Sequence, residues 1–210
     1  MSVASPDPSQ NARPRARRVW ARVLLTLWIP GVTLVIASWM VGHWAALPAP
    51  TENDTRTTEA LVELRDAQGL AGWTRVHVLF SDCGCSKRVF DALVDQPLAS
   101  DATDVALLVG DAEAQASRAA EVGLTHVRLT TEDLEQQYGI VSAPLLLILA
   151  PDGSLAYAGG HTDRKRGFAI QSDALLERLR AGEEVEPLPV FGCGVSRDLQ
   201  RQLDPLGLKY

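Results

Sequence analysis

The stretch RVHVLFSDCGCSKRVFDALV, residues 75–94, decides the fold of this chain. Its first seven residues are rich in apolar and β-branched side chains, a composition typical of a buried strand. The pattern breaks at residues 82–86, Asp-Cys-Gly-Cys-Ser, which favour a turn. Residues 87–94 then carry apolar side chains at helical spacing. We therefore predict a strand, a tight turn with two cysteines and a helix in direct succession.

Helical and strand patterns alternate on both sides of this stretch. The further predicted elements are a helix from residue 57 to about 69, strands at 104–109 and 127–129, helices at 112–122 and 131–138, a strand at 145–150, its hairpin partner at 154–158 and a helix at 172–180. Strands that alternate with helices and then end in a hairpin and a helix indicate an α/β sandwich.

Charge is distributed unevenly along the chain. The net charge is −6, yet the first 22 residues carry five arginines and a single acid, Asp7. The remaining residues hold 15 basic and 25 acidic side chains. Nucleic-acid binding normally requires a basic face. Because the body of the chain is acidic, we expect no nucleic-acid partner.

Twenty residues from Val23 to Gly42 contain no charged side chain. This length suits a helix that crosses a membrane, and the arginines before it favour a cytoplasmic N-terminus. We predict a disordered cytoplasmic tail at residues 1–18, a single transmembrane anchor at 19–46 and a linker at 47–58. The main domain would then lie in the periplasm, anchored in the inner (cytoplasmic) membrane of a bacterium. A signal peptide cleaved near Trp44–Pro48 is the alternative.

The two cysteines stand where a strand gives way to a helix, a position that favours reactive thiols. Backbone N–H groups at a helix N-terminus stabilise an anion, so we expect a lowered pKa for the thiol of Cys83. A thiolate there can attack another disulfide through a mixed-disulfide intermediate. Cys83 is the predicted nucleophile and Cys85 its resolving partner. No cofactor is required, because the cysteines carry the electrons.

The order of elements, the cysteine pair and an apolar strand introduced by Pro144 resemble the thioredoxin-like superfamily. The resemblance covers residues 57–182. It implies a three-layer sandwich, with a mixed central sheet and flanking helices, that exchanges disulfides with protein thiols. It also places Ala143 and Pro144 in a cis-proline loop that faces the cysteines and shapes the substrate groove. We expect this domain at residues 59–183 and a C-terminal extension at 184–210.

The cysteine spacing departs from the usual pattern of that superfamily. Two residues normally separate the pair, whereas Gly84 alone separates Cys83 from Cys85, and Ser86 stands where the second cysteine is usual. A disulfide across one residue closes a small, strained ring, which predicts a relatively oxidising couple or an isomerase-like exchanger. Residues 189–196, near the C-terminus, extend the resemblance to the RedB-like, membrane-anchored bacterial members of the superfamily.

Cys193 lies between Gly192 and Gly194, and the two glycines would let the backbone approach another element closely. Cys193 is either a resolving cysteine that exchanges with the CxC pair or a structural thiol, permanently bonded or buried. The sequence leaves both interpretations open, because spatial proximity cannot be inferred from spacing.

Two other functions remain as alternatives. Cys83, Cys85 and the imidazole of His161 form a ligand set for copper, as in thioredoxin-like metallochaperones. The main hypothesis requires no metal. A peroxiredoxin-like peroxidase would use the same reactive cysteine, but the sequence lacks the threonine motif expected of that class.

Overall fold

The computed structural model describes residues 12–44, 46–51, 53–95, 102–164, 169–205 and 207. The chain separates into two units, with the boundary after Trp44. The first unit contains one long helix, and the second contains the whole sheet and every other helix that the described residues form.

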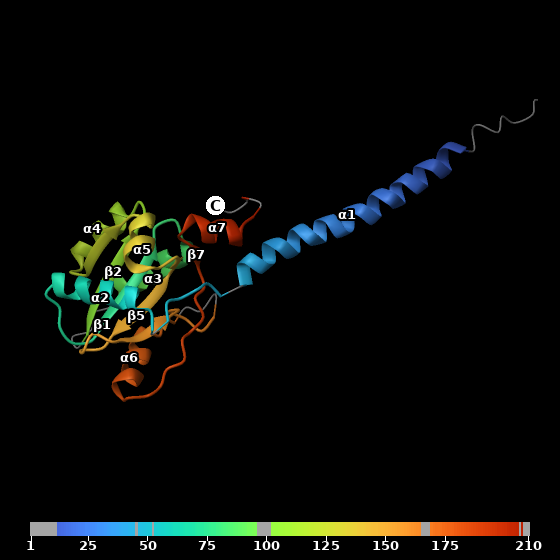
Figure 1. The fold of residues 1–210 in the computed structure, drawn as a ribbon. Helices are drawn as coiled ribbons and strands as arrows, with labels where there is room; N and C mark the ends of the chain where they lie inside the picture. The colour runs from blue at the N-terminus through green and yellow to red at the C-terminus, as the bar shows by residue number, and fades with distance from the viewer. Residues whose placement is uncertain are drawn as a thin grey trace, which may run out of the picture. The chain divides into compact units, whose positions relative to one another are not determined.

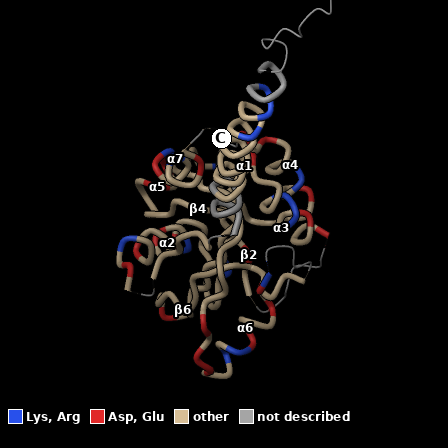
Figure 2. Tube along the Cα trace, turned by 90° about the vertical axis from the view of Figure 1, so that its right-hand side faces the viewer, with Lys and Arg blue, Asp and Glu red and all other residues tan. Residues whose placement is uncertain are grey.

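The first unit is built on helix α1 (Ala12–Trp44). Residues 12–18, predicted as part of a disordered tail, are helical, and residues 1–11 of that tail lie outside the described residues. The segment Arg17–Ala37 is long and apolar enough to cross a membrane, with a mean hydropathy of 1.8. A signal sequence near the N-terminus meets the same criterion. Figure 2 shows basic residues toward the N-terminal end of this helix.

A mixed five-stranded sheet forms the centre of the second unit (Figure 1). Its strands are β1 (Thr74–Phe80), β2 (Thr103–Val109), β3 (Thr125–Leu129), β5 (Leu145–Leu149) and β6 (Leu155–Gly159), in the order β3-β2-β1-β5-β6. β1, β2 and β3 are parallel, whereas β5 pairs antiparallel with β1 and β6 antiparallel with β5. β1 and β5 are buried along their full length, which explains their largely apolar composition.

Helices cover both faces of the sheet. α2 (Thr55–Ala67) and α5 (Thr131–Tyr138) pack on one face, where Leu61 and Leu134 join one apolar cluster with residues of β1, β2 and β5. α3 (Gly84–Asp95), α4 (Glu113–Glu121) and α6 (Ser172–Arg180) cover the other face. The βαβ unit of β1, α3 and β2 and the ββα unit of β5, β6 and α6 confirm the predicted thioredoxin-like three-layer sandwich.

Three short elements have no counterpart among the predicted ones. They are β4 (Ser142–Ala143), β7 (Cys193–Gly194) and α7 (Arg197–Leu203). β4 and β7 form a second, two-stranded antiparallel sheet. Two-residue strands carry no periodic pattern, so the sequence offered no signal for them.

Both segments predicted to flank the domain are part of it. Leu47, expected in a linker, is buried, and its N–H donates to the carbonyl oxygen of Val190 at 2.9 Å. Of the predicted C-terminal extension, Val185, Val190 and Val195 are buried. These residues are buried because their apolar side chains pack into the same clusters that the sheet and helices form.

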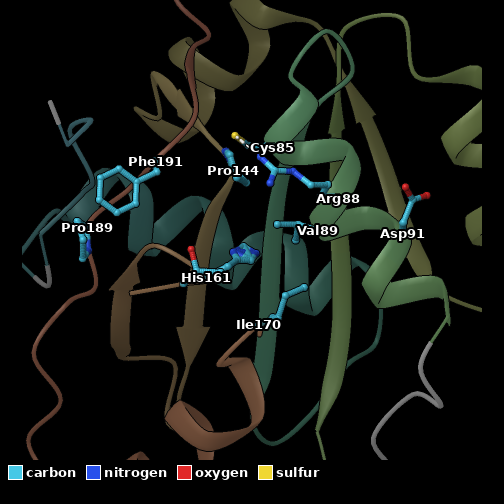
Figure 3. A pocket seen from close by; sticks show the side chains of 10 residues that line it. Cys85, Arg88, Val89, Asp91, Pro144, His161, Ile170, Pro189 and Phe191 are labelled. Carbon is cyan, nitrogen blue, oxygen red and sulfur yellow. Dashed lines mark hydrogen bonds between the residues drawn. The ribbon is translucent and has the colours of Figure 1, made fainter. Parts of the chain in front are cut away.

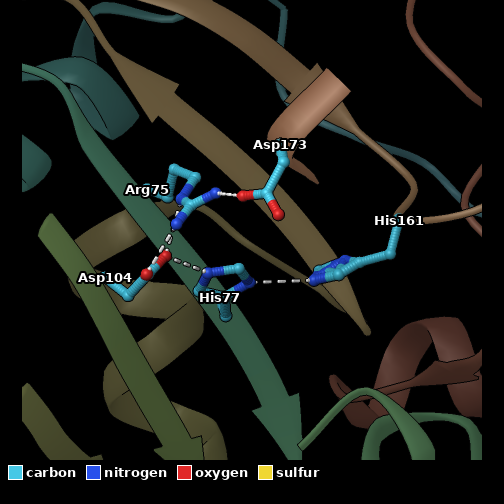
Figure 4. Close-up of polar contacts among 5 residues, drawn as sticks. All are labelled: Arg75, His77, Asp104, His161 and Asp173. Carbon is cyan, nitrogen blue, oxygen red and sulfur yellow. Dashed lines mark hydrogen bonds and ion pairs between the residues drawn. The ribbon is translucent and has the colours of Figure 1, made fainter. Parts of the chain in front are cut away.

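A buried polar network lies on the face of the sheet that α3 and α6 cover (Figure 4). Arg75 Nε contacts the Asp104 carboxylate at 2.7 Å, and Arg75 also pairs with Asp173 of α6. The same carboxylate lies 2.9 Å from His77 Nε2, and His77 Nδ1 lies 3.2 Å from His161 Nε2. Arg75 meets Asp104 because β1 and β2 pair in a register that sets these two residues side by side.

Burial and neighbouring charges shift the pKa values of two groups in this network, His161 and Asp104. Burial, together with the charge of His77, lowers the pKa of His161 to about 3. Burial opposes ionisation of Asp104, but the contacts with His77 and Arg75 outweigh it and lower the pKa of that carboxyl. His161 Nδ1 is buried and has no hydrogen-bond partner among the described residues.

The pKa of His161 predicts how stability depends on pH. Between about pH 6.5 and 3 the unfolded chain binds a proton at this imidazole that the folded chain excludes, so the free energy of unfolding should fall as the pH drops through this window. By pH 4 the loss should reach roughly 3 kcal/mol. Denaturant titrations between pH 7 and pH 4 measure it, and His161→Gln should remove most of the slope.

The matched control is His126→Gln, which removes a half-buried histidine of β3 that contacts the carbonyl of Leu124 rather than the network. Its slope should match that of the wild type. An equally steep slope in His161→Gln would contradict the assignment.

Candidate active site

The turn between β1 and α3 carries both cysteines of the CxC motif. Cys83 directly precedes α3, and its carbonyl oxygen accepts from the N–H of Lys87 at 3.0 Å. The side chain of Cys83 is 0% exposed, whereas Cys85, in the first turn of α3, is partly exposed. Ser86, at the usual place of a second cysteine, is buried, and its Oγ accepts from the N–H of Phe80 at 3.1 Å. Ser86 thus ties the start of α3 to the end of β1.

The loop before β5 faces these cysteines. The Ala143–Pro144 peptide bond is cis, and the Cys83 Sγ lies 3.8 Å from the carbonyl oxygen of Ala143. Ala143 belongs to β4, and the antiparallel register of β4 with β7 sets Cys193 directly opposite Ala143. The cis-proline loop that the resemblance implied is therefore present and flanked by two cysteines from distant parts of the chain.

All three cysteines of the chain meet at this loop. The thiol of Cys83 is in hydrogen-bonding contact with both Cys85 and Cys193. The structure thus brings Cys193 to the CxC pair, a proximity that the sequence alone left open. Cys83 is the thiol that the other two share.

Residues 188–196, here called the C-terminal segment, hold Cys193 in place. The carbonyl of Leu188 accepts from the N–H of Gly160 at 2.8 Å, and the N–H of Val195 donates to the carbonyl of Val141 at 2.7 Å. Between these contacts, Gly192 lies against the cis-proline loop. A Cβ atom on Gly192 would be 1.9 Å from the oxygen of Ala143, so only glycine permits this approach.

The surroundings of Cys83 and Cys85 raise the pKa of both thiols, whereas a helix N-terminus alone would lower it. The hydrogen bond to Cys193 and burial raise the pKa of Cys83, although contacts with Cys85 and with the backbone of Ser86 act the other way. The lowered pKa predicted for Cys83 is therefore wrong for the reduced site, because the contact with Cys193 and burial outweigh the helix N-terminus. Contact with Cys83 and burial also raise the pKa of Cys85, and the guanidinium of Arg88 opposes this rise.

A cavity of about 270 Å³ opens beside Cys85 (Figure 3). Its apolar wall includes Val89, Pro144, Ile170 and Phe191, and its polar lining includes Arg88 and His161. Arg88 donates to the Sγ of Cys85 at 3.3 Å. Cys85, rather than the predicted nucleophile Cys83, is the cysteine that this cavity exposes.

Among the residues that the structure describes, no group of three or more His, Cys, Asp and Glu side chains is placed to hold a metal ion. The Nε2 of His161, the residue proposed for copper, points to His77 instead. The copper hypothesis therefore gains no support from the geometry. Sequence reasoning missed the polar network that His161 joins through His77. Its members Arg75, His77 and Asp104 could have been noticed as polar residues inside strands predicted to be buried.

The sheet order, the helices on both faces and the cis-proline loop beside a cysteine pair define a thioredoxin-like fold. No protein-family model and no curated protein matches the chain. Solved structures similar to it include a hypothetical protein of Sinorhizobium meliloti 1021, at 17% identity over 64% of this chain and 82% of that chain, with a TM-score of 0.49.

An uncharacterised conserved protein of Geobacillus kaustophilus is 19% identical over 60% of this chain and 77% of its own, with a TM-score of 0.45. A proposed thiol-disulfide oxidoreductase of Bacteroides vulgatus is 18% identical over 42% of this chain and 63% of its own, with a TM-score of 0.32. At these low similarities we base the fold class on the strand order and loop of the chain itself.

The close approach of Gly192 to Ala143 leads to the prediction that β7 covers Cys83. In Gly192→Ala the new methyl group would collide with the backbone of Ala143 and the ring of Pro144, so β7 should separate from β4. We expect alkylation of Cys83 by iodoacetamide to become at least about tenfold faster, because a fully buried thiol reacts only when the structure opens.

The matched control is Gly69→Ala. Gly69 has a φ of +65° and open space around its Cα, so this variant costs backbone strain of about 1–2 kcal/mol without touching the site. Cys83 alkylation should stay at the wild-type rate in the control. A wild-type rate in Gly192→Ala as well would mean that β7 does not protect Cys83.

Proposed function

We propose that this chain is a membrane-anchored thiol–disulfide oxidoreductase or exchanger, similar to the RedB-like proteins, that acts through its CxC motif on the extracytoplasmic side of a bacterial inner membrane. The observation that carries the proposal is the meeting of three cysteines at a cis-proline loop, where the Cys83 thiol contacts both Cys85 and Cys193. A purely structural role would require one permanent disulfide. A thiol that contacts two others allows a disulfide to change partners.

The reaction needs only the cysteines. A thiolate attacks one sulfur of a substrate disulfide, a mixed disulfide forms and the other substrate sulfur leaves as a thiolate. A second cysteine of the site then attacks the mixed disulfide and releases the substrate as a dithiol. Two electrons pass to the substrate, and a disulfide remains in the site. The reverse sequence oxidises a protein dithiol, so the substrates are protein thiols and disulfides in either direction.

The membrane location is supported by α1 and by the charge distribution. The apolar segment Arg17–Ala37 has a length suited to the hydrocarbon core of a membrane. Arginines precede it, and the rest of the chain is acidic. The positive-inside rule then puts the thioredoxin-like domain outside the cytoplasm, where disulfides persist.

Reduction of insulin disulfides by dithiothreitol, with the full chain in detergent micelles, tests the chemistry. The wild type should accelerate the reaction, and the double variant Cys83→Ser/Cys85→Ser should fall to the uncatalysed rate, because it lacks both cysteines of the motif. Ser117→Ala, on the exposed face of α4, serves as the control and should keep the wild-type rate. A wild type that reacts no faster than buffer would refute the proposed activity.

Labelling with a membrane-impermeant maleimide tests the location. Spheroplasts that express the full chain with an N-terminal tag should be labelled on Cys85 before lysis, because the cysteine is partly exposed and faces outward. Retention of the tag in the membrane fraction distinguishes an anchor from a cleaved signal peptide. Labelling only after lysis would place the domain in the cytoplasm instead.

A further inference from the structure

We infer that the disulfide of this site moves between two bonds, a Cys83–Cys193 bond outside the cavity and a Cys83–Cys85 bond whose sulfur at Cys85 reacts with the substrate. The inference rests on the proposed thiol–disulfide function and assigns the order in which the three thiols act. It departs from the sequence prediction, in which Cys83 meets the substrate first.

Exposure decides which sulfur can meet a substrate. An attacking thiolate must reach a sulfur along the line of the bond that breaks, and Cys83 has no exposed surface for such an approach. Cys85 is partly exposed and stands in the wall of the 270 Å³ cavity. A substrate sulfur that enters this cavity therefore meets Cys85 and not Cys83.

The C-terminal segment closes the other route to Cys83. The backbone of β4, beside the cis peptide bond, could pair with an extended substrate. In this chain β7 already pairs with it, and Cys193 stands opposite Ala143. Cys193 thus occupies the position of a substrate cysteine, held there by Gly192 and by the hydrogen bond of Val195 to Val141. The cavity beside Cys85 is the approach that remains open.

Cys83 is placed to connect the two sulfurs, because it contacts both Cys85 and Cys193. The cause that most raises the pKa of Cys85 is its contact with the Cys83 thiol. When Cys83 is bonded to Cys193, that thiol no longer exists, and the guanidinium of Arg88 at 3.3 Å favours the Cys85 thiolate. A Cys83–Cys193 disulfide therefore leaves Cys85 more reactive than it is in the fully reduced site.

The internal step requires no external reagent. The Cys85 thiolate attacks the sulfur of Cys83, the bond between Cys83 and Cys193 breaks, and Cys193 leaves with the electron pair and takes up the proton that Cys85 lost. One disulfide is exchanged for another, and the number of electrons in the site is unchanged.

The external step oxidises a substrate dithiol. A substrate thiolate attacks Cys85, Cys83 leaves with the electron pair, and the second substrate thiolate displaces Cys85. The substrate loses two electrons and two protons, and the protons end on Cys83 and Cys85. The apolar walls of the cavity, formed by Val89, Ile170 and Phe191, fit a substrate cysteine that is flanked by an apolar side chain.

Disulfide mapping of the full chain, with glutathione disulfide as the probe, tests the order. The reduced chain is treated with the probe, acid-quenched and alkylated with iodoacetamide, and fragment mass spectra locate the alkylated cysteine. The wild type should contain a Cys83–Cys193 disulfide with Cys85 alkylated, and Cys193→Ser should contain Cys83–Cys85 instead. Cys83→Ser should keep a glutathione adduct on Cys85, because that variant lacks the thiol that resolves it.

Cys85→Ser should react with the probe at least about tenfold more slowly than the wild type, since it lacks the only cysteine among the residues that line the cavity. Of the thiols that remain, Cys83 is buried, and Cys193 is partly exposed but does not line the cavity. Thermal unfolding checks that each variant is folded, and Cys85→Ala replaces Cys85→Ser if that variant is not. A wild-type disulfide between Cys83 and Cys85 with Cys193 alkylated would overturn the inference, as would a wild-type rate in Cys85→Ser.

Insulin reduction separates the two possible failures. If either overturning outcome occurs while the wild type still accelerates insulin reduction, the order of the thiols is wrong and the proposed function stands. If the wild type neither reduces insulin nor forms any disulfide with the probe, the proposed function fails and the inference fails with it.

Discussion

The antiparallel pairing of β4 with β7 is the contact that assembles the thiol site. It joins two residues before a cis-proline to two residues from the C-terminal segment. The pairing is possible because Gly192 has no side chain where the backbone of Ala143 passes. Through it, Cys193 reaches Cys83, which is thereby shielded from solvent. The position of β7 also leaves the cavity at Cys85 as the open approach, so one short backbone contact determines the burial, the neighbours and the accessibility of the thiols.

A second constraint acts on the five-stranded sheet. Arg75, His77 and Asp104 face the side of the sheet that α3 and α6 cover. They lie between two apolar clusters. One is formed by β1, β2, α3 and α4, and the other by β5, β6 and α6. Removing one partner of a buried ion pair usually costs about 3–5 kcal/mol, because the other charge is left uncompensated. The pairing of Arg75 with Asp104 is therefore a strong restraint on the register of β1 and β2. The chain of contacts continues through His77 to His161, which lies in the lining of the cavity.

Much of the fold follows from local sequence patterns. Thr130 caps α5 through a capping box with Asp133, a local pattern of a hydroxyl residue followed three positions later by an acid. The strand and helix around the CxC motif lie within a few residues of their predicted positions, because both have strong apolar periodicity. Patterns of this kind describe elements that fold onto a common sheet. They contain no information on contacts between distant irregular segments.

The parts of the site that the sequence did not predict depend on such distant contacts. Cys193 carried a local signal in its two flanking glycines, which indicated close approach but not the element approached. The pKa of Cys83 was predicted from the helix N-terminus alone, and the thiol that most raises it, Cys193, comes from outside that turn. Leu47 was assigned to a linker from the surrounding composition, whereas its partner is Val190 at the other end of the domain. Each difference arises from a partner that is remote in sequence.

The distance along the chain between Cys83 and Cys193 has a consequence for biosynthesis. More than a hundred residues separate them, so Cys83 and Cys85 leave the ribosome long before Cys193 is made. During that interval β4 has no β7 to pair with, and Cys83 has no cover. The first bond that an oxidising compartment can form within the nascent chain is the one across Gly84. When that bond forms first, a chain whose mature disulfide includes Cys193 reaches it by rearrangement, so its maturation ends with the same kind of exchange that it is proposed to perform on other proteins.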